Sequence, residues 1–144
     1  MTKEEFARNF EILDASVPKH AKINKKIELD IYMENLKDLS GESFSKAIAY
    51  ILLNQRTFYQ FPTIREIREL CYKYDNKATL FKKAFEKVLV DALVYEEVPK
   101  NYNLFIKEAI NDIGGWKFLK AINSYEDKKE IEYKFITILL KKEI

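Results

Sequence analysis

The chain has 144 residues, of which 47% are hydrophobic and 33% are charged. This balance favours a folded globule and excludes a disordered chain, which combines low hydrophobicity with a high net charge. The formal net charge is only +2, from 25 basic and 23 acidic residues, whereas a dedicated DNA-binding domain usually has a much larger basic excess.

The scarcity of turn-forming residues predicts an all-α fold. Glycine and proline occur only three times each, too few for the many tight turns of a β-sandwich or barrel. Cys71 is the single cysteine, so an internal disulfide is excluded. The amino terminus is charged where a signal peptide is apolar, and no apolar run reaches the roughly 18 residues of a membrane span. We therefore expect a cytoplasmic protein without a membrane partner.

Apolar residues in the first half of the chain recur at spacings of three or four, which predicts four amphipathic helices. Ser40 can cap the third helix, and Thr63 with Glu66 has the spacing of a capping box at the start of the fourth. The aromatic segment 57–62 is expected to be extended, because a proline disfavours helix in the residue before it. The expected ranges are about 3–16, 24–39, 40–52 and 63–74.

The second half has the clearest helical period, in an inward stripe that runs from Phe81 to Leu93. A later helix stops at the pair Gly114 and Gly115, where one glycine can take the left-handed carboxy-terminal cap. The expected helices cover about 81–93 and 105–113, followed by a short helix or turn at 116–122 and a final helix from 124 to the charged end at 141–143.

These elements predict an all-α, compact bundle of about seven helices. The polar stretch from Asp75 to Lys77 is the weakest point of the pattern. It would divide the chain into an amino-terminal lobe, 1–74, and a carboxy-terminal lobe, 75–144, unless the two pack as one domain.

Residues for enzyme or metal chemistry are scarce. One cysteine and one histidine, Cys71 and His20, do not supply the four ligands of a zinc site, and no G-x-x-x-x-G-K-[ST] phosphate loop or G-x-S-x-G elbow is present. His20 is expected in a solvated loop and Cys71 on the inward stripe of its helix. We therefore predict a protein that is not an enzyme, binds no cofactor and no metal, and works by binding other macromolecules.

Two short segments supply candidate binding residues. Arg65 and Arg68 are expected on the outward side of their helix, where they could meet phosphate or acidic protein groups. Trp116 follows the glycine pair and is flanked by Lys117 and Lys120, and tryptophan is enriched at binding hot spots. A structural role is the alternative for both segments, with Phe61 to Thr63 wedged between helices and Trp116 buried in a core.

Several phrases of the sequence resemble the phage and prophage replicative helicase loader/inhibitor family. The resemblance is carried by Tyr32 to Leu36, by Leu39 and Ser40 with Phe44 and Ala47, and above all by Phe61-Pro62-Thr63-Ile64-Arg65-Glu66-Ile67-Arg68. This last phrase has one proline where relatives often have two. The stretches Ala84 to Leu89 and Ala109 to Trp116, with Phe135 after them, are similar to the carboxy-terminal part of longer relatives.

The resemblance implies a protein that binds the ring-shaped replicative helicase, holds it inactive and delivers it to an origin complex, without hydrolysing ATP itself. It places the helicase contact in the carboxy-terminal portion, from about Lys117 onward and especially in the last helix. The alternative is a DNA-binding replication or regulatory protein of a mobile element, with nucleic acid held by Arg65, Arg68 and nearby lysines such as Lys73. An adaptor of another mobile-element pathway stays open, and a cryptic hydrolase comes last.

Overall fold

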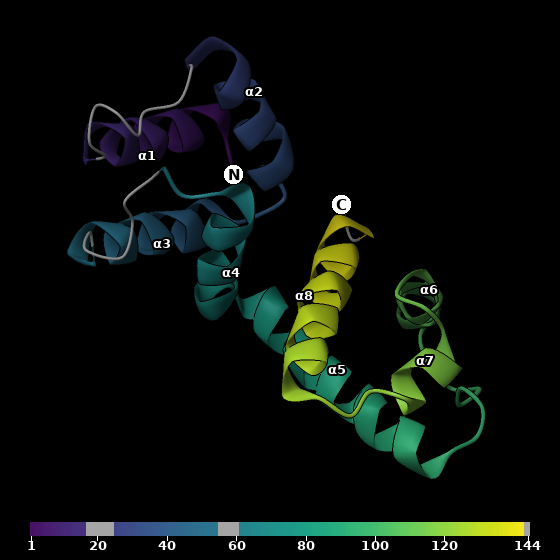
Figure 1. Cartoon of the computed structure of the whole chain (residues 1–144). Coiled ribbons are helices and arrows are strands. Elements are labelled where there is room, and N and C mark those ends of the chain that lie inside the picture. The colour runs from purple at the N-terminus through teal and green to yellow at the C-terminus, as the bar shows by residue number, and fades with distance from the viewer. Residues whose placement is uncertain (17–24, 55–60, 143–144) are drawn as a thin grey trace. The chain divides into compact units, whose positions relative to one another are not determined.

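The computed structural model describes residues 1–16, 25–54 and 61–142, and these form eight α-helices and no strand (Figure 1). The predicted all-α class is confirmed, and the number of helices is close to the expected number of about seven. Contacts between residues divide the chain into two compact units, Met1–Asn76 and Lys77–Ile144. The sequence placed the boundary two residues earlier, after residue 74, and each unit is described by itself below.

The first unit contains α1 (Lys3–Ser16), α2 (Lys25–Leu36), α3 (Gly41–Leu53) and α4 (Ile64–Tyr74). Helix α3 packs against both α1 and α4, and α2 packs against α4. The caps expected from the sequence are present: the Ser43 amide donates to the Ser40 side chain, and Thr63 and Glu66 form both hydrogen bonds of a capping box. Local sequence therefore sets where α3 and α4 begin.

Helix α2 ends three residues before the expected limit of 39. The amide of Leu39 donates to the Leu36 carbonyl at 3.0 Å, a tighter turn than the α-helix makes. Leu39 is buried beyond this turn, and Ser40 begins the next helix. The chain thus turns between two buried leucines before α3.

Rings from three helices and one connecting segment form the aromatic core of the first unit. Phe10 of α1 lies 5.6 Å from Tyr32 of α2 and 5.2 Å from Phe61, between ring centroids. Phe6 stacks on Phe44 of α3 at 5.6 Å. Such ring pairs add stability beyond the burial of their area, so α1, α2 and α3 are joined by the same cluster.

The second unit contains α5 (Asn76–Val94), α6 (Leu104–Asp112), α7 (Trp116–Lys120) and α8 (Tyr125–Lys142). Helix α5 begins directly after Asp75, so the expected connection 75–77 is shorter than predicted. At the other end of α5, Leu93 is 80% exposed, and its assignment to the inward stripe is wrong. Residues from all four helices form one core: Phe85, Val88, Ala92, Ala109, Ile110, Trp116, Leu119, Ile131, Phe135 and Leu139.

Candidate partner-binding surface

The segment before α4 is a packing junction. The ring of Phe61 lies between Phe10 and Tyr32, with centroids 5.2 and 5.6 Å away. Pro62 is buried, and its carbonyl oxygen accepts the Tyr32 hydroxyl at 2.7 Å. Thr63 caps α4. The structural role considered for Phe61, Pro62 and Thr63 is therefore confirmed, while residues 57–60 lie outside the described part of the chain.

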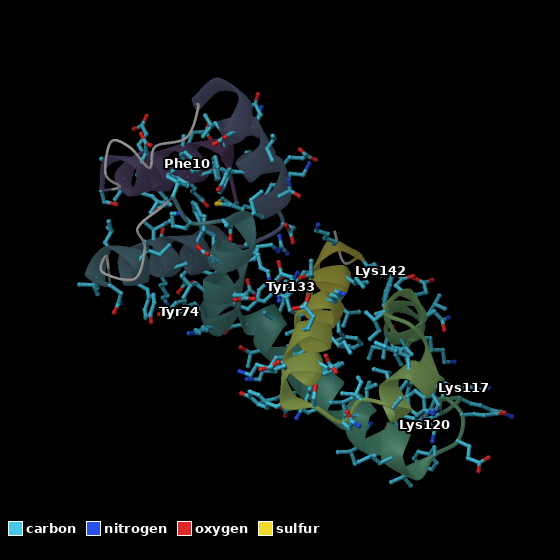
Figure 2. The ribbon with its side chains drawn as sticks, in the orientation of Figure 1. Phe10, Tyr74, Lys117, Lys120, Tyr133 and Lys142 are labelled. Atoms are coloured by element: carbon cyan, nitrogen blue, oxygen red, sulfur yellow. The ribbon has the colours of Figure 1, made fainter. Side chains whose placement is uncertain are left out.

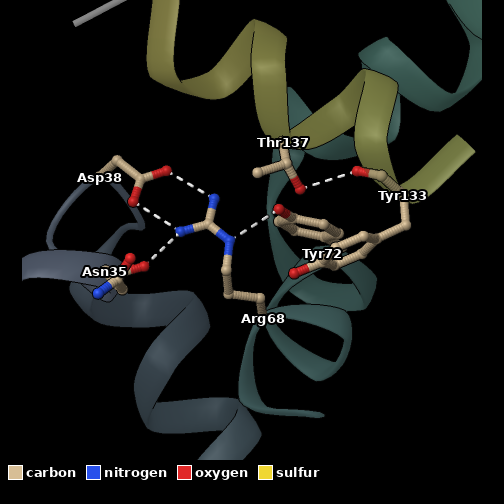
Figure 3. Close-up of polar contacts among 6 residues, drawn as sticks. All are labelled: Asn35, Asp38, Arg68, Tyr72, Tyr133 and Thr137. Atoms are coloured by element: carbon tan, nitrogen blue, oxygen red, sulfur yellow. Dashed lines mark hydrogen bonds and ion pairs between the residues drawn. The ribbon is translucent and has the colours of Figure 1, made fainter. Parts of the chain in front are cut away.

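Arg68 does not lie on the outward side of α4, and that prediction is wrong. Its side chain is 3% exposed and donates to both carboxylate oxygens of Asp38 at 2.7 Å (Figure 3). The same guanidinium donates to the Asn35 carbonyl at 2.7 Å and to the Tyr72 hydroxyl at 2.9 Å. Burial lowers the pKa of Arg68. Hydrogen bonds and charge interactions with Asp38 and Tyr72 raise this pKa by more, so its net shift is upward. Arg68 therefore joins α4 to the end of α2, and its guanidinium is not available to bind a phosphate.

Arg65 lies on the exposed side of α4, as expected. Its Nε donates to Glu69 Oε1 at 2.8 Å, one helical turn away. An exposed pair at this spacing is weak, about 0.3–0.5 kcal/mol.

Cys71 is buried on the inward side of α4, as predicted. Burial is the main cause that raises the pKa of its thiol to about 12, although the Arg68 charge lowers it. A thiol with such a pKa is almost wholly protonated near neutral pH and is a poor nucleophile. His20 lies outside the described residues.

The glycine pair after α6 forms a Schellman motif. The amide of Gly115 donates to the Ile110 carbonyl at 2.9 Å, and that of Gly114 to the Asn111 carbonyl at 3.3 Å. Both glycines have positive φ, 129° and 91°, so the predicted left-handed cap at this site is confirmed. Gly115 is also the N-cap of α7. Helix α7 therefore begins directly after the glycine pair and packs back onto the core.

Trp116 holds α7 in place. Its indole Nε1 donates to the Tyr95 carbonyl at 3.1 Å, and its ring meets Tyr102 edge-on at 6.1 Å. The side chain is 8% exposed and belongs to the core of the second unit. The alternative that placed Trp116 in a core is therefore the one that the structure supports, and a partner would not reach most of its surface.

Helix α7 instead presents other side chains to solvent. Lys117 is exposed and Lys120 half-buried on this short helix (Figure 2). Phe118, between them, is 45% exposed and rests against the backbone of Gly114. We call Lys117, Phe118 and Lys120 the α7 surface. Phe118 was not among the binding residues predicted from the sequence, although a large aromatic between two lysines after a helix end could have indicated it.

We predict that Gly115→Ala lowers the free energy of unfolding by about 1–3 kcal/mol, because φ of 91° with ψ of 174° suits glycine alone. A Cβ there meets nothing within 4 Å, so the cost comes from the backbone. Urea unfolding followed by circular dichroism measures it. Gly41→Ala, at a glycine without positive φ, is the control. Its Cβ would meet only the end of the flexible Glu5 side chain, which can move aside, so stability should change far less; equal losses would contradict the prediction.

The described residues form neither a metal-binding cluster nor a membrane-spanning helix. Among residues 1–16, 25–54 and 61–142, no group of three His, Cys, Asp or Glu side chains is placed to hold a metal ion. Within the same ranges, no helix has the length and apolar character to span a bilayer. Comparison with known proteins adds no assignment: no family model, curated protein or solved structure matches the chain.

Proposed function

We propose that this chain is a non-enzymatic accessory protein of phage or prophage DNA replication that binds the replicative helicase. The proposal starts from the phrases that resemble the loader/inhibitor family. The observation that supports it is the α7 surface, which exposes Phe118 beside two lysines in the region where the resemblance places the helicase contact. Aromatic residues, phenylalanine included, are enriched at protein interfaces, and Phe118 lies on a helix that Trp116 anchors to the core.

The phrase Phe61 to Arg68 supports the fold of the first unit and is not part of the proposed helicase contact. Phe61 and Pro62 pack in the first unit, Thr63 caps α4, and Arg68 pairs with buried Asp38. A relative would need these residues to keep the fold of that unit, whatever its partner. The phrase therefore supports a shared fold, and the α7 surface is the proposed contact.

The DNA-binding alternative loses one of its two arginines. Arg68 is held by Asp38 and the Asn35 carbonyl, so Arg65 and exposed Lys73 would have to hold phosphates without it. The ammonium group of Lys73 lies over the ring of Tyr50, 5.5 Å from its centroid. Without Arg68 the surface of α4 offers fewer phosphate contacts, and DNA affinity depends on their number.

Titration of the purified chain against the host's purified replicative helicase tests the proposal. We expect a complex, and the double variant Lys117→Glu with Lys120→Glu should weaken it about tenfold or more, since reversed charges at a contact repel. Phe118→Ser should weaken it similarly. Lys82→Glu with Lys83→Glu on α5, the same double charge change at exposed lysines outside this region, is the matched control and should bind like the original chain.

The proposed function is wrong if the helicase does not bind and capture from a host lysate recovers no other replisome component. If binding occurs and is equally strong in the α7 variants, the contact lies elsewhere. A salt-sensitive complex with DNA alone, unaffected by helicase, would favour the alternative.

A further inference from the structure

Helix α7 carries positive charge that no acid of its own segment balances. From Ile113 to Ser124 the chain contains two lysines, Lys117 and Lys120, and no acidic residue. Within the part of the chain that the structure describes, neither lysine forms an ion pair. The α7 surface therefore has two cations that can pair with acidic groups of another molecule.

The two acids of the preceding helix, α6, already have a cation. Between Leu104 and Ser124 the only acidic residues are Glu108 and Asp112. Lys142 of α8 binds both, with its Nζ 2.9 Å from Glu108 Oε2 and 3.3 Å from Asp112 Oδ2. The acids nearest to α7 in this stretch of the chain are therefore engaged by α8 and leave the lysines of α7 unpaired.

The ring of Phe118 is an apolar contact that the backbone holds in position. The side chain is 45% exposed, yet a Cβ built on Gly114 would lie 2.7 Å from its ring, so the ring lies directly against the main chain of that glycine. This contact restricts the free side chain, and a restricted side chain loses less conformational freedom when a partner covers it. Phe118 is therefore preorganised for contact with an apolar group.

The arrangement of these groups defines the molecule that would complement them. Lys117 and Lys120 are three residues apart, the spacing at which two side chains of a helix are neighbours, while Trp116 and Leu119 hold the inward side of α7 in the core. The complement is a segment with an apolar side chain for Phe118 and carboxylates beside it. Nucleic acid is a poorer match, because its affinity depends on the number of phosphates that are neutralised, and α7 offers two cations.

We infer that the α7 surface binds an acidic segment of its protein partner, in which an apolar side chain packs on Phe118 and neighbouring carboxylates pair with Lys117 and Lys120. The burial of apolar area at Phe118 supplies most of the affinity, since exposed ion pairs are individually weak. The charges select acidic segments and repel basic ones. The inference rests on the proposed function for the identity of the partner, because it assigns the chemistry of the same contact.

An NMR titration of the isotope-labelled full chain tests the inference with a defined probe. The probe is a short, blocked helical peptide with leucines on one side and glutamates beside them. It should shift the amide signals of residues 114–121 with a dissociation constant of about 0.1–1 mM, as expected for a small contact. Replacing its glutamates by glutamine, or its leucines by serine, should raise that constant about tenfold or more.

A charge exchange makes the test specific. The double variant Lys117→Glu with Lys120→Glu should lose the acidic peptide and instead bind a matched peptide in which lysines replace the glutamates. Lys82→Glu with Lys83→Glu on α5, the same charge change at exposed lysines, is the matched control and should bind the acidic peptide like the original chain. Circular dichroism melting checks that each variant is folded.

Three results would overturn the inference. The first is the absence of any shift at residues 114–121 with millimolar acidic peptide, and the second is equal binding of the acidic and the lysine peptide by the unchanged chain. The third is a tighter complex with oligothymidylate than with the acidic peptide, which would assign the surface to nucleic acid.

The peptide titration and the helicase titration can fail separately. If the helicase binds the chain and the acidic peptide does not, the proposed function stands and this inference is wrong. If the acidic peptide binds at residues 114–121 and the helicase does not bind, the acidic preference of the α7 surface stands and the proposed function is wrong.

Discussion

Replacing Arg68 with alanine should lower the free energy of unfolding of the first unit by about 3–5 kcal/mol, the usual cost of removing one partner of a buried ion pair. The loss leaves the Asp38 carboxylate, whose side chain is 4% exposed, without its cation. The Asn35 carbonyl and the Tyr72 hydroxyl lose a donor at the same time. Urea unfolding followed by circular dichroism measures the change.

Two further variants make this result specific. Arg65→Ala removes an exposed pair on the same helix and should cost less than about 0.5 kcal/mol. Replacing Arg68 and Asp38 together by leucine leaves no charge unpaired and should recover much of the loss. Similar losses for Arg65→Ala and Arg68→Ala would show that the pair with Asp38 is not the cause.

Replacing Trp116 with alanine should cost about 3–5 kcal/mol in the second unit, the range for removing a large aromatic from a core. The variant removes an indole that packs in that core, meets Tyr102 edge-on and donates to the Tyr95 carbonyl. Thermal unfolding followed by circular dichroism should show a lower midpoint than in the original chain.

The loss of stability expected for Trp116→Ala makes binding experiments with this variant ambiguous. A partner lost on Trp116→Ala would reflect the unfolding of α7 as readily as a lost contact. Lys117→Ala, at an exposed neighbour, should leave stability within about 0.5 kcal/mol of the original. If Trp116→Ala is as stable as Lys117→Ala, the tryptophan does not anchor α7.

The features that the sequence predicted well are local ones. The capping box of Thr63 and Glu66 and the glycine cap after α6 depend on residues within one turn of each other. Their geometry follows from the free amides and carbonyls at helix ends, which any tertiary arrangement leaves to be satisfied. Helix periodicity is equally local, and it was enough to predict the all-α class.

The errors concern residues whose surroundings come from distant parts of the chain. Arg68 lies beside the apolar stripe of α4, and its partner Asp38 is 30 positions away, so the helix pattern could not show that the arginine is buried. Leu93 continues the period of α5, but it lies beyond the part of the helix that the core covers. Period alone does not say where a core stops.

The α7 surface shows the same difference between what the sequence indicated and what the tertiary structure decided. The sequence marked the segment from Gly114 to Lys120, because it contains two of the three glycines and the single tryptophan of the chain. Only the tertiary structure decided that Trp116 faces inward while Phe118 and Lys117 face solvent. The physical reason is that local hydrogen bonding sets where a helix begins and ends, whereas burial depends on which other helices pack against it.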